Sequence, residues 1–313
     1  MKRFKNILVY SEGREEDRAA LERAVELASR NQGRLSVAGV VQELPRDLRR
    51  LAAAVPLEDL ENLAMQDMRE QLVALVQEKA PRPEVEVFIG KPFIEIIRGV
   101  QRFQHDLVMV TKESTGRLWQ PVFGSLSLRL MRKCPCPVWV LNPAKGQRFA
   151  RILAAVDPDA SDVVRDGVNR KVMELATSLA LLEEAELHVA HAWEFEENKV
   201  MRGWQARVPE TQLSDWMEQS RAAHEHRYQE LLALFDLEAV KHRVHFVRGE
   251  AGNVIPQLAA EHSIDLVVMG TVARSGIEGY LMGNTAETVL QRVECSVLTT
   301  KPDGFVSPVR GGG

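Results

Sequence analysis

The residues best suited to bind a ligand lie in segment 266–292. There a short apolar run, a glycine-bearing loop and a polar stretch typical of a helix follow one another. Gly270 ends the apolar run and Gly283 ends the loop. Asn284 is a residue type that caps helices, and Glu287 follows three positions later, as at many helix starts. Such a loop leaves the first N–H groups of the helix unbonded beside a partial positive charge. The segment therefore predicts an anion site, and phosphate is the anion usually bound there.

The same layout occurs once earlier in the chain. Asp106 corresponds to Asp265, and Gly124 corresponds to Gly283 at the same spacing. The period is near half of the chain, so the pattern indicates a tandem duplication rather than a solenoid of short repeats.

Strands and helices alternate along both halves and must position these loops. Apolar runs predict strands at 6–11, 35–41, 85–89, 107–111 and 138–141, and amphipathic patterns predict helices at 15–31, 58–79, 93–103 and 125–132. The second half repeats this order, with strands at 152–156, 187–193, 244–247, 266–269 and 297–300 and helices at 162–182, 213–235, 254–260 and 285–292. Such alternation is typical of parallel strands covered by helices on both faces. We therefore predict an α/β protein with two tandem, doubly wound, five-stranded parallel sheets.

The domain boundaries follow from the duplication. We expect a first domain at 1–143, a second at 150–302 and a tail at 303–313. The segment between the domains is short and polar, so the two domains should touch. The tail contains Pro, Gly and Ser and is expected to be an extended arm or disordered. Within the first domain, Gly33 is predicted to end helix 15–31 as its C-cap.

The composition narrows the class of protein. Among 313 residues, 45% are hydrophobic and 27% are charged, as in an ordinary globular protein. The net charge of −4 offers no basic surface, so direct nucleic-acid binding is not expected. No apolar run approaches the roughly 18 residues that a membrane span needs, and the N-terminus lacks the apolar core of a signal peptide. Three cysteines do not form a disulfide framework, so a reducing cytoplasm is the expected compartment.

Several motifs of this sequence resemble those of a known protein family. Gly270-x-x-Ala273, followed after nine residues by Gly283-Asn284, resembles the phosphate-binding loop of the universal stress protein family. Residues 152–157 resemble the first strand of that family with its terminal Asp, and the likeness spans nearly the whole chain, twice. It implies a Rossmann-like fold of the adenine nucleotide alpha hydrolase type. It also implies a stress-response role, including resistance to DNA-damaging agents.

The resemblance further implies that the second domain binds ATP or another phosphorylated ligand at the carboxyl ends of its strands. The residues carried over are Asp157, Ala192 through its backbone, Gly270, Ala273, Gly283, Asn284 and Thr285. Two of them depart from the family pattern, because Ala273 replaces a glycine and Asn284 replaces Ser or Thr. If position 273 needs a positive φ, alanine costs about 1 kcal/mol there. Asn284 can still cap a helix and donate a hydrogen bond.

The first domain lies further from this pattern. Glu12 takes the position of the terminal Asp, and Thr111 and Ser114 take the first two glycine positions. Only Gly124 and Ser125 remain as weaker candidate ligands. At positions 111 and 114 side chains replace glycines, where the backbone would need to approach a phosphate closely. We therefore predict that the first domain is a degenerate copy with a structural role.

Histidines and cysteines offer alternative chemistry. His188 and His191 lie three apart on a strand, point to opposite faces and so do not readily share a metal ion. The remaining histidines considered are expected to be solvated or partly buried: His224, His226, His242 and His245. No metal site is predicted. Cys134 and Cys136 suit either a redox pair or small buried residues, and the second interpretation is favoured.

The sequence lacks the usual catalytic motifs. It contains no Gly-x-Ser-x-Gly, no Walker lysine and no nucleophile–base pair in a known context. The leading hypothesis is a cytoplasmic stress-response protein with a ligand-sensing second domain. A weak ATPase remains an alternative, as does an interaction scaffold with empty sites that works through surfaces such as loop 194–213.

Assembly is expected to follow from the last strand of each domain. Segments 138–141 and 297–300 are apolar edge strands that need cover. The family resemblance implies that these strands pair between domains, which makes the chain an internal pseudo-dimer. Two such chains are then expected to form a homodimer.

Overall fold

The computed structural model describes residues 4–43, 57–112, 123–145, 148–158, 162–195, 209–271 and 282–311. The chain divides into two compact units. Unit 1 comprises Met1–Gln147, Ala273–Met282 and Glu294–Gly313, and unit 2 comprises Arg148–Val272 and Gly283–Val293. The end of the second repeat is therefore part of unit 1.

The sheet of unit 1 is built from six strands. They are β1 (Asn6–Tyr10), β2 (Arg34–Val41), β3 (Glu84–Ile89), β4 (Leu107–Thr111), β5 (Val138–Leu141) and β10 (Ser296–Thr300). The order is β3-β2-β1-β4-β5-β10. The strands from β3 to β5 are parallel, whereas β10 runs antiparallel to β5 with Leu298 opposite Trp139. The pairing of the last two strands, expected from the family resemblance, is thus present within unit 1.

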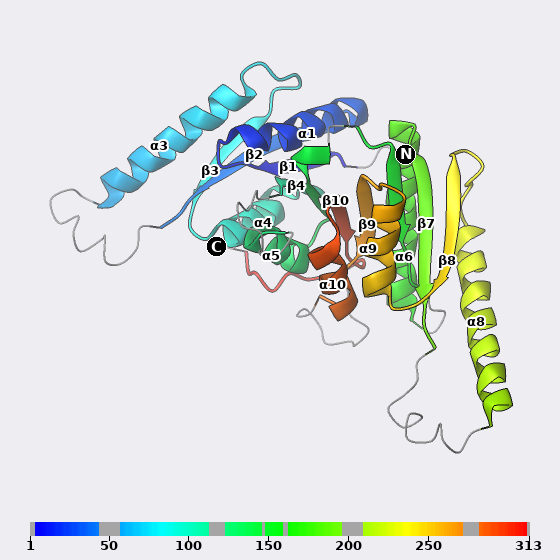
Figure 1. Ribbon diagram of the computed structural model, residues 1–313. Helices are drawn as coiled ribbons and strands as arrows, with labels where there is room; N and C mark the ends of the chain where they lie inside the picture. Colours follow the sequence, from blue (N-terminus) through cyan, green and yellow to red (C-terminus); the bar gives the residue numbers. More distant parts are fainter. Residues whose placement is uncertain are drawn as a thin grey trace. The chain divides into compact units, whose positions relative to one another are not determined.

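Helices cover both faces of this sheet (Figure 1). They are α1 (Arg18–Asn31), α3 (Leu57–Val76), α4 (Pro92–Phe103) and α5 (Ser125–Lys133), with short 3-10 turns at Glu15–Asp17 and Pro143–Lys145. Helices α1 and α3 lie on one face, and α4 and α5 lie on the other. Strands β1, β2, β4 and β5 are almost wholly buried, which explains their apolar sequences, whereas the edge strand β3 is mostly partly exposed.

The end of α1 corrects the prediction for Gly33. Gln32, not Gly33, adopts the left-handed conformation, with φ 53° and ψ 43°. Gly33 donates its N–H to Ala28 O at 2.9 Å. A Cβ at position 33 would lie 3.0 Å from Lys5 O. Glycine is therefore needed there because the backbone passes close to the chain before β1.

Unit 2 has a four-stranded parallel sheet in the order β9-β6-β7-β8. Its strands are β6 (Arg151–Ala155), β7 (Glu186–Trp193), β8 (His242–Arg248) and β9 (Leu266–Gly270). Its helices are α6 (Val163–Glu183), α8 (Glu210–Leu232), α9 (Ala251–Glu261) and α10 (Asn284–Arg292). Helices α6 and α8 cover one face, and α9 and α10 pack together on the other (Figure 1). The predicted α/β class, with strands and helices alternating twice, is confirmed.

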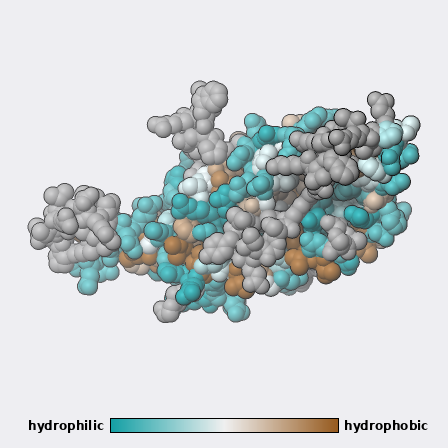
Figure 2. All heavy atoms as spheres, turned by 90° about the horizontal axis from the view of Figure 1, so that it is seen from below, coloured by the Kyte–Doolittle hydropathy of each residue, from teal (hydrophilic) through white to brown (hydrophobic). Residues whose placement is uncertain are grey.

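The tail lies along helix α4 of unit 1. Gln101 Nε2 donates to Val309 O at 3.1 Å, and Arg98 Nε donates to Arg310 O at 3.4 Å. On the face shown in Figure 2 the described residues are mostly hydrophilic, and hydrophobic ones lie in separate groups. Within the described residues, no helix is both long enough and apolar enough to cross a membrane.

Candidate functional site

The first candidate residue, Asp157, follows β6 and has a firmly held backbone. Its N–H donates to Asn169 Oδ1 at 2.9 Å, and Asn169 Nδ2 donates back to Asp157 O at 2.9 Å. Asn169 belongs to α6 and is 4% exposed. The Asp157 side chain is 44% exposed, and its carboxylate lies 3.5 Å from Arg165 Nη1. The sequence thus places an accessible carboxylate on a rigid turn at the carboxyl end of β6.

Helix α10 begins beside the neighbouring strand. Its N-cap is Gly283, whose N–H donates to Thr271 O at 3.3 Å, just after β9. Asn284 is therefore the first residue of the helix and not its cap, which corrects the prediction. Because glycine has no side chain to cap the helix, the N–H groups of Asn284, Thr285 and Ala286 find no acceptor in the part of the chain that the structure describes.

Gly270 has a structural explanation of its own. A Cβ at this position would lie 2.5 Å from Val168 Cγ1 of α6. The glycine is therefore required by the packing of α6 against the end of β9, whatever binds nearby. Ala273, which replaces the second glycine of the motif, lies outside the described residues.

The third strand of the site contributes Ala192. This residue pairs with Val247 of β8 and is partly exposed near the carboxyl end of β7. Since β9, β6 and β7 are neighbours in that order, Gly270, Asp157 and Ala192 follow or end three adjacent parallel strands at one edge of the sheet. This is the edge at which open α/β sheets bind ligands. The free N–H donors suit a phosphate, and the carboxylate suits a hydroxyl donor.

The corresponding turn in unit 1 is closed by its own side chains. The Asp17 carboxylate accepts from Ser11 Oγ at 2.9 Å and from the N–H groups of Glu12 and Arg14 at 2.8 and 3.3 Å. Burial raises the pKa of Asp17. Glu12, the counterpart of Asp157, instead accepts from Tyr10 Oη at 3.0 Å. The polar groups after β1 are thus bonded within the chain.

The start of α5 is also more crowded than that of α10. Gly124 is its N-cap and Ser125 its first residue. The preceding Phe123 is buried, and Lys112 Nζ lies 5.5 Å from the centre of its ring. Burial lowers the pKa of Lys112. Thr111 Oγ1 donates to Glu16 O at 3.4 Å, and Ser114 lies outside the described residues.

A second constellation of chemical interest is a histidine cluster in unit 2. One ring nitrogen from each of His188, His245 and His262 lies within 4.8 Å of the others. His188 Nδ1 and His245 Nε2 are 3.0 Å apart. Burial and the neighbouring His245 lower the pKa of His188 to about 4. The sequence interpretation missed this cluster because helix α9 separates His262 along the chain from β7 and β8.

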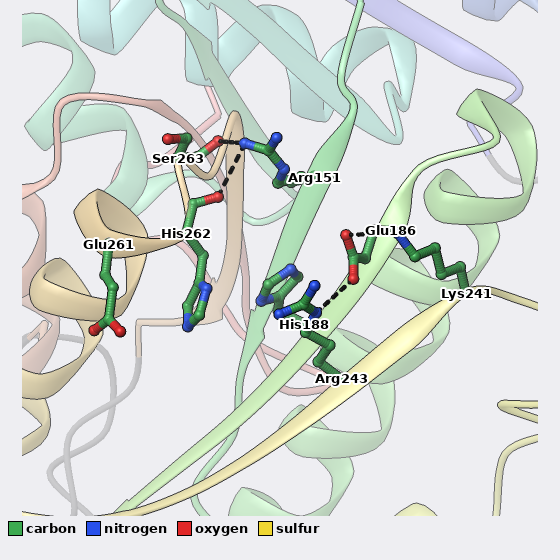
Figure 3. Close-up of a pocket in the computed structure, with 8 residues that line it drawn as sticks. All are labelled: Arg151, Glu186, His188, Lys241, Arg243, Glu261, His262 and Ser263. Atoms are coloured by element: carbon green, nitrogen blue, oxygen red, sulfur yellow. Dashed lines mark hydrogen bonds and ion pairs between the residues drawn. The ribbon is translucent and has the colours of Figure 1, made fainter.

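The period of two along each strand was available from the sequence, but the register that puts His188 and His245 on one face was not. Residue 190 pairs with His245 in the parallel ladder of β7 and β8, so His188 and His245 project on one face. Beside the cluster is a pocket of about 410 Å³ (Figure 3). It is lined by Arg151, Glu186, His188, Lys241, Arg243, Glu261, His262 and Ser263.

His191 lies on the opposite face, as predicted. Its Nδ1 is 3.1 Å from Val156 O, and its Nε2 is 3.2 Å from His224 Nδ1. A carbonyl can only accept, so Nδ1 of His191 carries the proton and Nε2 accepts from His224. Burial lowers the pKa of His191. These contacts fix a neutral ring inside the layer formed by β7 and α8.

The two neighbouring cysteines of unit 1 are not joined by a disulfide. Cys134 Sγ and Cys136 Sγ are 3.5 Å apart. Lys301 Nζ donates to Met131 O, and burial lowers the pKa of Lys301 to about 8. Cys134 is buried, in keeping with the interpretation of a small residue in the core, whereas Cys136 is only partly buried.

Comparison with known proteins gives the family. The sequence model of the universal stress protein family matches residues 3–142 and 148–301. The chain is 28% identical to universal stress protein E of Escherichia coli K12, over 99% of this chain and 98% of that protein. It is 26% identical to universal stress protein E of Photorhabdus laumondii, over 99% of both chains.

A solved structure extends the likeness to three dimensions. A functionally unknown protein from Pseudomonas aeruginosa PAO1 shares 26% identity and a TM-score of 0.69, over 97% of this chain and 95% of that one. The family model matches both halves of the chain, and strands and helices alternate in each half. The chain therefore belongs to the universal stress protein family and carries two universal stress protein domains in tandem.

Proposed function

We propose that this chain is a cytoplasmic stress-response protein whose second repeat binds an adenine nucleotide, with ATP as the first candidate. Family membership supports the stress-response role. The observation that supports nucleotide binding is the position of α10. The helix begins beside the end of β9, and its first N–H groups have no acceptor among the described residues. The strand next to β9 is β6, which leads to the exposed carboxylate of Asp157.

Each part of the site has a distinct task in this proposal. The N–H groups of Asn284 and Thr285 donate to phosphate oxygens, and the helix dipole favours the negative charge. The Asp157 carboxylate accepts from a ribose hydroxyl. The backbone near Ala192 contacts the base. Because Asn169 holds the Asp157 backbone in place, the carboxylate is already positioned before a ligand arrives.

We assign a structural role to the first repeat. Asp17 already accepts the N–H groups that follow β1, and Phe123 is buried directly before α5. Binding there would require breaking hydrogen bonds inside the chain. One nucleotide per chain is therefore the expected stoichiometry.

Isothermal titration calorimetry with ATP tests the assignment. We expect one site per wild-type chain. Asp157→Ala should weaken binding about 10-fold or more, since a hydrogen bond to a charged group contributes about 1.5–3 kcal/mol. Ser125→Val, at the equivalent helix start of the first repeat, is the matched control and should leave binding unchanged. Absence of binding, or binding that Asp157→Ala leaves intact, would refute the proposal.

A phosphate-release assay on the same samples separates binding from catalysis. If released phosphate stays below one equivalent per bound nucleotide, the protein is a sensor. Continued turnover that Asp157→Ala abolishes would make the second repeat a slow ATPase.

Resistance to DNA-damaging agents is the finer role that we propose from the family resemblance. Survival of a deletion strain after ultraviolet irradiation, with and without the restored gene, tests it. Equal survival would contradict this role.

A further inference from the structure

The fold brings three histidines together from three separate elements of unit 2. His188 lies near the start of β7, and His245 lies on the same face of the neighbouring β8. Helix α9 packs on β7 and ends at Glu261, so His262 directly follows it. The three side chains therefore meet through the topology of the sheet and not through a local sequence motif.

The distances between the rings suit a shared ligand. The His188 ring centre lies 5.1 Å from that of His245 and 4.9 Å from that of His262, and the last two are 4.9 Å apart. Zn–N bonds of about 2.0–2.1 Å in a tetrahedral site place ligand nitrogens roughly 3.3 Å apart. The 3.0 Å separation of His188 Nδ1 and His245 Nε2 is already close to this value. His262 is partly exposed and can complete the set by rotating its side chain.

His188 is the most buried member of the cluster. It is 1% exposed, and its Nε2 is buried without a hydrogen-bond partner among the described residues. The nitrogen that faces His245 is Nδ1, on the other side of the ring, so Nδ1 is the atom placed to bind the metal.

We propose that His188, His245 and His262 form a binding site for a first-row transition metal ion, with Zn²⁺ as the first candidate. Three imidazoles are a donor set that Zn²⁺, Cu²⁺ and Ni²⁺ accept readily, whereas Mg²⁺ and Ca²⁺ require oxygen ligands. Three protein ligands leave a fourth position for water or an anion.

Hydrogen bonds and ion pairs surround the cluster. Arg151 Nη1 donates to His262 O at 3.2 Å and to Ser263 O at 3.3 Å, which holds the backbone that carries His262. Glu186 accepts from Arg243 Nε at 2.7 Å and from Lys241 Nζ at 3.2 Å beside His188 (Figure 3).

The charges of the pocket favour an anion in the fourth position. Arg151, Lys241 and Arg243 line it together with two acids, Glu186 and Glu261. The cations outnumber the acids, so a bound dication gains from an anionic partner such as hydroxide or chloride. The exposed residues on the rim, such as Arg243 and Glu261, leave a path for the ion from solvent.

This site is separate from the proposed nucleotide site. His188 precedes Ala192 by four residues on β7, a distance of about 13 Å along an extended strand. The histidines lie toward the starting ends of the strands, and the nucleotide site lies at the carboxyl ends. The metal site therefore does not rest on the proposed function.

Metal titration of the full-length, tag-free chain after treatment with a chelator tests the proposal. Calorimetry with Zn²⁺ should show one site per chain. Co²⁺ should bind with the visible absorption of a tetrahedral complex and without a thiolate charge-transfer band. His245→Gln and His262→Gln are suitable variants because both side chains are partly exposed. Each variant should weaken Zn²⁺ binding by more than about 10-fold. Loss of a group that merely supports a metal ligand already costs about 10-fold or more in affinity, and these variants remove a ligand itself.

His242→Gln is the matched control. His242 lies on β8 like His245, but it is exposed and outside the cluster, with Nδ1 3.1 Å from Val240 O. It should leave the Zn²⁺ affinity unchanged. Circular dichroism of every variant checks that it is folded. The proposal is overturned if the wild-type chain binds no stoichiometric Zn²⁺, or if binding survives both His245→Gln and His262→Gln. It is equally overturned if Co²⁺ shows a thiolate band that Cys134→Ser removes.

Discussion

Asn169 holds the backbone of Asp157 from both sides, with its Oδ1 accepting from the Asp157 N–H and its Nδ2 donating to the Asp157 carbonyl, each at 2.9 Å. The two functions of the turn therefore belong to different residues. Asn169 maintains the shape of the turn, and in the proposed function the exposed Asp157 carboxylate meets the ligand. Stability and affinity should respond separately when these residues are changed.

Asn169→Ala should destabilise unit 2. It leaves the Asp157 peptide without both partners in a buried setting, which costs about 1–3 kcal/mol per unsatisfied group. Denaturant unfolding measures the loss, and ATP affinity should fall with it. Asp157→Ala should lower ATP affinity while changing stability by less than about 0.5 kcal/mol. Gln229→Ala, at an exposed position of α8, is the control for the unfolding measurement. Equal destabilisation by Asn169→Ala and Asp157→Ala would contradict this separation.

Gly270→Ala should destabilise the protein through packing alone. The new Cβ would lie 2.5 Å from Val168 Cγ1, and overpacking of this kind costs about 1–3 kcal/mol. Val168→Ala removes the opposing methyl groups and should recover part of the loss in the double variant. A double-mutant cycle on unfolding free energies measures this coupling. Additive effects would show that glycine is needed at position 270 for another reason.

The sequence predicted most of the fold because burial on both faces gives parallel strands continuous apolar runs between amphipathic helices. It also placed Asp157 after β6 and Gly270 at the end of β9, and carboxyl ends of neighbouring parallel strands share one edge. It could not reveal the reason for Gly270. That reason is contact with Val168, about a hundred positions earlier, and the glycine motif alone suggested a ligand.

The histidines show the same limit. The period of two along a strand correctly separated His188 from His191. The place where a helix ends relative to a sheet has no local signature, so His262 was not associated with His188. Likewise the left-handed C-cap predicted at Gly33 is Gln32, and glycine is needed at position 33 because the backbone passes close to Lys5.

Leu298→Ala should destabilise unit 1 although residue 298 belongs to the second repeat. Leu298 is fully buried on β10 and lies opposite Trp139 of β5. Removing a buried leucine side chain costs about 2–5 kcal/mol. Amide hydrogen exchange should show the loss of protection in β5. Val306→Ala, at a side chain that is 77% exposed in the tail, should have little effect. Unchanged protection of β5 would contradict the role of β10 as part of the unit 1 sheet.

His105 should make unit 1 sensitive to acid. Asn6 Nδ2 donates to two carbonyls, so Asn6 Oδ1 accepts from His105 Nδ1–H at 3.0 Å. The His105 Nε2 is buried without a partner among the described residues. Burial lowers the pKa of His105, although Asn6, Asp106 and Glu84 oppose the shift.

Below the unfolded pKa of about 6.5, the unfolded chain takes up a proton at His105 that the folded chain does not. Stability is therefore lost as the pH falls below about 6.5, by at most about 1.4 kcal/mol per pH unit from this group. His105→Asn keeps a donor near the position of Nδ1 and removes the titration. Denaturant unfolding of both proteins between neutral pH and pH 5.5 should show the wild-type chain losing more stability than the variant. A parallel pH dependence of the two proteins would show that His105 takes up its proton equally well in the folded state.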